Sequence, residues 1–178
     1  MKNNLKLKKT KKIFIIVSIL IGLALILGGV TAYILFSEKH TYKPSAGKPL
    51  VNPTQGLSLE EAIKKFDDKF IYYLLVSIKA YDLHNPPFSS NIPKIEIYVD
   101  KDIYYGKISE GKITVGKGNI ENPDITIRTT KEEAVKMIQN KNYIADSFKN
   151  GLSSIELNAG KLELASKGYL NLYNQFSA

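Results

Sequence analysis

The sequence predicts one α+β domain, an antiparallel five-stranded sheet covered by helices, preceded by one transmembrane helix. Three observations lead to this prediction. Residues 13–36 are apolar and carry no charge. Five short segments after residue 94 have the alternating or branched composition of strands. Segments with apolar residues three and four apart lie before and after these strands, and strands in a run with helices apart from them are typical of an α+β domain.

The apolar segment 13–36 has twenty-four residues without a charge. As a helix it would extend roughly 36 Å, against a bilayer core of about 30 Å. A helix satisfies its own backbone hydrogen bonds, which a single segment in lipid requires. The segment is therefore long enough to cross a membrane.

Lysines determine the predicted orientation of this helix. Six lie before it, with no acidic residue among them: Lys2, Lys6, Lys8, Lys9, Lys11 and Lys12. This excess predicts a cytoplasmic N-terminus and an extracytoplasmic C-terminal domain in a single-pass protein of the cell membrane. The chain carries a formal charge of +8, so without these six lysines it is close to neutral. The tail is expected to contact the bilayer surface, and no nucleic-acid partner is expected.

A cleaved signal peptide is the alternative interpretation of the N-terminus. Basic residues, an apolar run and the small residues of 30–32 follow the order of such a signal, and cleavage there would leave a chain beginning at Tyr33. The apolar run is long for a signal and continues to residue 36. We therefore expect an uncleaved signal-anchor.

Small residues on one face of the predicted transmembrane helix suggest pairing with a second helix. Their spacing of four, seven and three places them together: Ser18, Gly22, Gly29 and Ala32. Close approach at such residues would allow a homodimer. Leu25 interrupts the face, and small residues are frequent in membrane helices in any case.

The chain is expected to have four parts. Residues 1–12 form a basic cytoplasmic tail, 13–36 the transmembrane helix, 37–57 a flexible linker rich in Pro and Gly, and 58–178 the folded domain. The sequence contains no cysteine and two histidines, which excludes disulfides and leaves little for a metal site. No metal and no cofactor are expected.

Capping patterns and apolar spacing predict the helices of the domain. Ser58 with Glu61, and Thr130 with Glu133, have the spacing of capping boxes. After Ser58 one apolar face is predicted, although the second half, 70–78, is also compatible with a strand: Ile63, Phe66, Phe70, Leu74, Ile78 and Tyr81. A short helix is predicted at 143–148. One final helix is predicted with this inner face: Leu162, Ala165, Tyr169, Leu172, Tyr173 and Phe176.

The strands are predicted at 95–99, 103–108, 113–115, 125–127 and 155–157. Tight turns at 100–102 and 110–112 join the first three into an antiparallel meander. A further turn, Asn122-Pro123-Asp124, precedes the fourth strand.

The order of elements in the second half resembles a known family. The turn and strand of 122–127 lead into a capped helix at Thr130, then Phe148-Lys149-Asn150-Gly151, a strand from Ile155 and a closing helix. This succession resembles the sterol carrier protein 2 domain family. The resemblance implies a sheet with helices over it, and an apolar tunnel that holds a lipid or fatty acyl chain in a non-catalytic module. The chain departs from the family in its membrane anchor, in its C-terminal residues 175–178, and in Ser153 and Ser154 before the last strand.

Seven apolar residues are the candidates to line such a lipid site: Phe66, Phe70, Met137, Phe148, Leu172, Tyr173 and Phe176. Phe and Met suit a pocket that adapts to a flexible chain. Each of them could instead be an ordinary core residue, because periodicity does not separate a packed core from a tunnel wall.

The acidic pairs do not indicate catalysis. They lie at predicted helix starts, on a solvated face and in a turn, without a histidine or metal-ligand spacing. We therefore expect no enzyme, but a membrane-anchored module that binds a lipid or fatty acid. The alternative is a tethered extracytoplasmic interaction domain with a filled core and a protein partner.

Overall fold

The computed structural model describes residues 50–174. The predicted tail (1–12), the apolar segment 13–36, the candidate pairing residues Ser18, Gly22, Gly29 and Ala32, most of the predicted linker, and Phe176 lie outside the described residues. In the part that is described, no helix combines the length and the apolar character needed to cross a membrane.

Two short helices open the domain, α2 (Leu59–Lys64) and α3 (Asp68–Ser77), followed by the 3-10 turn η2 (Ala80–Asp82). The predicted capping box is confirmed, since Ser58 Oγ accepts from Glu61 N–H and the Glu61 carboxylate accepts from Ser58 N–H. The prediction of one continuous helix is wrong, because Asp67 caps a new helix by accepting from Lys69 N–H. The alternative of a strand at 70–78 is also wrong. Leu50 and Leu57, in the predicted linker, pack against the core.

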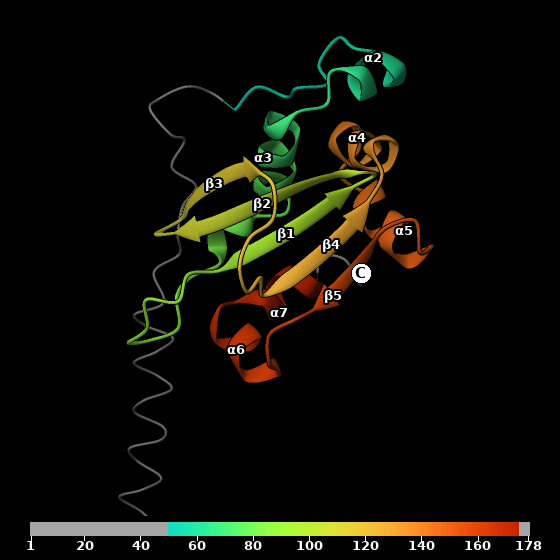
Figure 1. The fold of residues 1–178 in the computed structure, drawn as a ribbon. Coiled ribbons are helices and arrows are strands. Elements are labelled where there is room, and N and C mark those ends of the chain that lie inside the picture. The colour runs from blue at the N-terminus through green and yellow to red at the C-terminus, as the bar shows by residue number, and fades with distance from the viewer. Residues whose placement is uncertain (1–49, 175–178) are drawn as a thin grey trace, which may run out of the picture. The chain divides into compact units, whose positions relative to one another are not determined.

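The sheet has five strands in the order β3-β2-β1-β4-β5. They are β1 (Lys94–Val99), β2 (Asp102–Ser109), β3 (Lys112–Lys117), β4 (Ile125–Thr129) and β5 (Ser154–Leu157). All five predicted strands are confirmed, as is the hairpin turn at Glu110 and Gly111, where both residues have positive φ. Figure 1 shows this arrangement.

The prediction of an antiparallel sheet is wrong, because β1 and β4 are parallel and the sheet is mixed. The other neighbouring pairs are antiparallel. A tight turn determines only the pairing of the two strands that it joins. β4 follows the loop 118–124, which returns the chain to the start of β1, so that Asp124 N–H donates to Lys94 O at 2.8 Å. This parallel pair places the first residues of β1 and β4 side by side.

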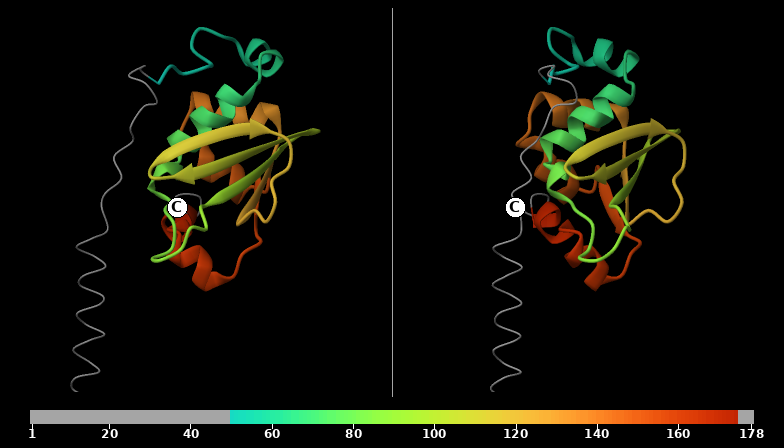
Figure 2. Two further views of the ribbon diagram at one scale, coloured as in Figure 1. Left: turned by 60° about the vertical axis from the view of Figure 1, so that its left-hand side comes forward. Right: turned by 90° about the vertical axis from the view of Figure 1, so that its left-hand side faces the viewer.

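Helices cover one face of the sheet (Figure 2). The buried side chains of β1 and β4 alternate toward that face: Ile95, Ile97, Val99, Ile125 and Ile127. Gly106 of β2 lets the Leu75 side chain of α3 approach the strand closely. The opposite face is polar, and there the Arg128 guanidinium lies over the Tyr98 ring at 4.3 Å from its centroid.

The second half contains α4 (Lys131–Gln139), α5 (Tyr143–Lys149), α6 (Lys161–Ser166) and α7 (Tyr169–Asn174). Thr130 caps α4, but the Glu133 side chain does not complete the predicted box, because it turns to other partners. The prediction of a single final helix is also wrong. Gly168, with φ of +87°, separates α6 from α7, and Leu162 of the predicted inner face is 89% exposed.

Candidate functional site

Asp124 connects the starts of β1 and β4. It follows Asn122 (φ +50°) and Pro123, a pair that ends the returning loop and directs the chain into β4. The Asp124 carboxylate accepts from Lys94 N–H at 2.8 Å through Oδ2. The Asp124 carbonyl accepts from the backbone N–H groups of Asn158 and Ala159, at 2.9 and 3.0 Å. One residue thus holds three segments together at this end of the sheet.

A lysine is completely buried against this carboxylate. Lys167 has no exposed surface, and its Nζ lies 2.6 Å from Asp124 Oδ1 and 3.1 Å from Glu163 Oε1. Tyr169 donates its hydroxyl to Asp124 Oδ2 at 3.0 Å. Burial, followed by the negative charge of Asp124, raises the pKa of the Tyr169 hydroxyl far above its ordinary value. Asp124, Glu163, Lys167 and Tyr169 are called the Asp124 network below.

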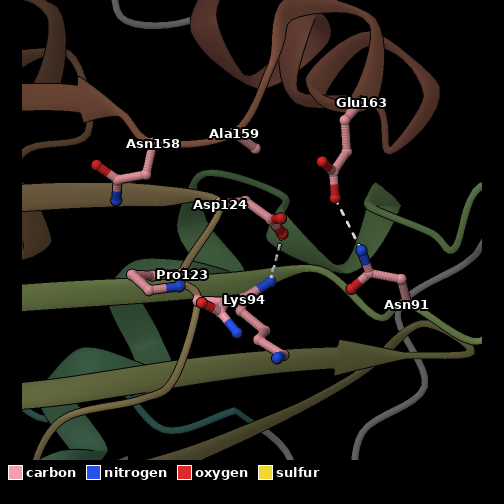
Figure 3. A pocket seen from close by; sticks show the side chains of 8 residues that line it. Asn91, Lys94, Pro123, Asp124, Asn158, Ala159 and Glu163 are labelled. Carbon is pink, nitrogen blue, oxygen red and sulfur yellow. Dashed lines mark hydrogen bonds between the residues drawn. The ribbon is translucent and has the colours of Figure 1, made fainter.

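A polar cleft of about 500 Å³ opens beside this network. Figure 3 shows its lining: Asn91, Lys94, Asn122, Pro123, Asp124, Asn158, Ala159 and Glu163. Asn91 Nδ2 donates to Glu163 Oε1 at 2.8 Å, and Asn158 Nδ2 donates to Thr126 Oγ1 at 2.8 Å. Lys94 Nζ donates to Glu121 O at 3.1 Å. The lining therefore combines amides and charged groups whose positions are held by neighbouring residues.

An apolar seam lies between α7 and the strands β4 and β5. Its lining is Ile125, Ile155, Leu157, Tyr169, Leu172 and Tyr173. The free volume in the seam is about 10 Å³, close to the size of one water. Leu157 is 52% exposed and Tyr173 is 50% exposed, so the seam opens to solvent along one side. The seam and the polar cleft share no lining residue, but the hydroxyl of Tyr169, which lines the seam, donates to Asp124, which lines the cleft.

The seven residues proposed from the sequence do not gather in one place. Leu172 and Tyr173 line the apolar seam. Phe66 and Phe70 lie under the other half of the sheet, with ring centroids 4.9 Å apart, and Phe66 also meets Tyr104. Met137 is buried in α4, and Phe148 packs against the core from α5. Phe176 lies outside the described residues, and a role of these side chains in binding a ligand stays a prediction.

Sequence reasoning missed the residues that form the polar cleft and the network. The sequence indicates a turn at Asp124 and gives no separate role to Lys167. One local signal points to Lys167: it is the C-terminal cap of α6, three residues after the buried Leu164, and so continues the buried face of that helix. No local signal links Asn91, Asp124 and Glu163, because they come from three distant segments.

A second polar network lies at the other end of β4. The Glu133 carboxylate accepts from the Ser147 hydroxyl at 2.8 Å, the Tyr143 hydroxyl at 3.0 Å and Lys136 Nζ at 3.1 Å. Ser153 Oγ lies 2.9 Å from Ser147 Oγ and 2.8 Å from Thr129 Oγ1. Burial raises the pKa of Glu133, but donation by Ser147, Lys136 and Tyr143 outweighs burial and lowers it overall. These residues are called the Glu133 network below.

Comparison with known proteins identifies structural similarity without assigning a family. No protein-family model matches the sequence, and no curated protein matches it. The stereoselective inverting sec-alkylsulfatase Pisa1 from Pseudomonas sp. is similar over 74% of this chain, with 15% identity and a TM-score of 0.38, and the chain spans only 18% of that enzyme. Sterol Carrier Protein 2 Like 2 from Aedes aegypti is similar over 55% of this chain and 92% of its own, with 18% identity and a TM-score of 0.33.

Sterol Carrier Protein 2 from Yarrowia lipolytica is similar over 67% of this chain and 88% of its own, with 16% identity and a TM-score of 0.31. Proteins of the class that the sequence resembles are therefore among the similar structures. At this level of similarity the comparisons assign neither a family nor an activity.

Proposed function

We propose that this protein is a membrane-anchored, non-catalytic module that binds a lipid or fatty acyl chain in the apolar seam. The observation that carries the proposal is the seam itself: six apolar or aromatic side chains from β4, β5 and α7 face one another, and Leu157 and Tyr173 are half exposed at its margin. The sequence resemblance to sterol carrier domains supports the same class of ligand.

An acyl chain requires more room than the seam holds. Ligand pockets generally enclose several hundred Å³, whereas this seam has about 10 Å³ free. We therefore propose that α7 moves outward when the chain enters. α7 has six residues, and Gly168 separates it from α6. Glycine rotates about its backbone bonds at low steric cost, so Gly168 is a suitable hinge.

Fluorescence of a naturally fluorescent polyene fatty acid, cis-parinaric acid, tests this proposal on the full-length protein in lipid nanodiscs. We expect saturable binding above that of empty nanodiscs. Leu157→Arg places a charge at the margin of the seam and should weaken binding at least tenfold. Leu162→Arg is the matched control, because Leu162 is 89% exposed and does not line the seam. Equal signals from the protein, the Leu157→Arg variant and empty nanodiscs would contradict the proposal.

The proposed anchor and topology have a separate test. Because the sequence contains no cysteine, a single Ser90→Cys substitution in the exposed loop before β1 gives one labelling site. A membrane-impermeant maleimide should label it in intact cells, and the intact mass should include residues 1–32. Labelling only after lysis would place the domain in the cytoplasm and contradict the proposed topology. A chain beginning at Tyr33 would show that the anchor is cleaved.

The small free volume of the seam favours one alternative function, an interaction module with a filled core. In that case Leu157, Leu170 and Tyr173, all at least half exposed, would contact a protein partner. The parinaric acid experiment separates the two candidates, because a filled core gives no saturable fatty-acid binding.

A further inference from the structure

The polar cleft has a size suited to a small molecule, and the proposed acyl chain does not use it. Its volume of about 500 Å³ lies within the range of small-molecule sites. At its base the Asp124 carboxylate is held by Lys167 Nζ at 2.6 Å and by Lys94 N–H at 2.8 Å, two contacts that do not involve α7. The chemistry of the lining determines which class of ligand it could accept.

The charged groups at the cleft balance one another, so they are poorly suited to bind an ionic ligand. Asp124 and Glu163 are balanced by Lys167 beneath them and by Lys94 at the cleft. Both oxygens of Asp124 are already engaged, Oδ1 by Lys167 and Oδ2 by Lys94 N–H and Tyr169. A cation would find no free Asp124 oxygen, and an anion facing Lys94 would lie near two carboxylates.

The remaining hydrogen-bonding groups are both acceptors and donors. Among the described residues, Asn91 and Asn158 each use their Nδ2 in an internal hydrogen bond, which leaves their Oδ1 atoms as acceptors. Glu163 uses Oε1, which leaves Oε2. Asn122 contributes a whole exposed amide, and Lys94 Nζ retains donors beyond its bond to Glu121 O. A hydroxyl group both donates and accepts, so it fits such a mixed lining.

We propose that the polar cleft binds an uncharged, hydroxyl-rich group such as a sugar ring or a polyol. The hydrogen bonds of Asn91 to Glu163 and of Asn158 to Thr126 orient both amides before the ligand arrives, which lowers the entropy cost of binding. The group is either a free saccharide or the head of a lipid, and the second case rests on the proposed function. A lipid head is a candidate because the hydroxyl of Tyr169, which lines the seam, is hydrogen bonded to Asp124, which lines the cleft.

Calorimetric titration of the full-length protein in nanodiscs tests the proposal with methyl β-D-glucoside, myo-inositol and glucose 6-phosphate. We expect saturable binding of at least one neutral probe, and at least tenfold weaker binding of glucose 6-phosphate. Asn158→Ala and Asn122→Gly should each weaken binding of the neutral probe at least fivefold. The second variant retains a residue suited to the positive φ of Asn122. Asn119→Ala, an exposed position in the same loop that does not line the cleft, is the matched control.

Hexyl β-D-glucoside identifies the source of the group. If the head belongs to a lipid, the hexyl chain should strengthen binding at least tenfold, and Leu157→Arg should remove that gain. Equal affinities for the methyl and hexyl glucosides indicate a free saccharide. Failure of the acyl proposal leaves methyl glucoside binding intact, so the two failures are distinguishable. The cleft proposal is overturned if no neutral probe binds, if the phosphate binds more tightly, or if both cleft variants bind as the control does.

Discussion

A polar network lies at each end of β4, and the two networks neutralise their carboxylates in different ways. At the start of β4, the Asp124 network holds a complete ion pair, with a fully buried ammonium between two carboxylates. At the other end, the Glu133 network spreads one carboxylate charge over two hydroxyls and the partly exposed Lys136. Removing one member of a buried ion pair leaves an unpaired charge, whereas removing a hydroxyl leaves a smaller defect.

The two networks also differ in their position relative to the candidate ligand sites. Asp124 and Glu163 of the Asp124 network line the polar cleft, and Tyr169 lines the apolar seam. The Glu133 network joins α4 and α5 to Thr129 at the end of β4 through Ser147 and Ser153. We infer that the start of β4 supports the ligand sites, and that its far end chiefly fastens helices to the sheet.

The largest expected loss of stability follows from a substitution at the start of β4. Lys167→Met removes the buried ammonium and leaves Asp124 and Glu163 without their cation, which should lower the free energy of unfolding by about 3–5 kcal/mol. Urea unfolding of the full-length protein in mild detergent, followed by near-ultraviolet circular dichroism, measures this loss. The exposed Lys161→Met is the control and should change stability by less than about 0.5 kcal/mol. Similar values for the two variants would mean that the ion pair does not hold this end together.

The second effect is at the far end of β4. Glu133→Gln keeps the shape of the side chain but turns an amide toward hydroxyl donors, so the free energy of unfolding should fall by about 1–3 kcal/mol. Its neighbour Glu132 pairs with Lys136 from a side chain that is 55% exposed. Glu132→Gln should therefore cost less than about 0.5 kcal/mol in the same unfolding experiment. If Glu133→Gln lowers the free energy of unfolding more than Lys167→Met does, the far end of β4 contributes more to stability than its start, which contradicts this account.

The smallest expected effect is the pH dependence of the stability that Glu133 contributes. The net lowering of the Glu133 pKa means that its carboxylate stabilises the folded state above the unfolded pKa of about 4.3. This stabilisation should disappear as the pH falls through the lower pKa of the folded state. The difference in unfolding free energy between the wild-type protein and Glu133→Gln should be constant from pH 7 to pH 5 and shrink below pH 4. A difference that grows on acidification would show that the pKa is raised instead.

Much of the fold could be predicted, because local signals specify local structure. The Ser58 capping box and the turn at Glu110 and Gly111 are encoded within four residues, and both are confirmed. The breaks at Asp67 and Gly168 were missed because apolar spacing continues across them. The parallel pairing of β1 with β4 was missed because it depends on the path of the whole loop 118–124 and on no tight turn.

The candidate sites were less predictable. Lysine is rarely buried without a partner, and the partners of Lys167 include Asp124, which lies forty-three residues earlier in the chain. The polar cleft combines side chains from three such distant segments, so it appears only when the sheet is assembled. Leu172 and Tyr173 line the seam, as the period of a helix predicts for a face that packs against the sheet, and their role in ligand binding stays a prediction. That period does not reveal whether the face meets a filled core or a ligand.

The central claim is that an acyl chain enters the seam between α7 and β5. A photoactivatable diazirine fatty acid, cross-linked to the full-length protein in nanodiscs and mapped by peptide mass spectrometry, tests it most directly. We predict labels on the peptides that contain Leu157 and Tyr173, lost when unlabelled palmitic acid competes and reduced in Leu157→Arg. Labelling confined to residues 1–49, or labelling of the seam that palmitic acid does not displace, would contradict the account.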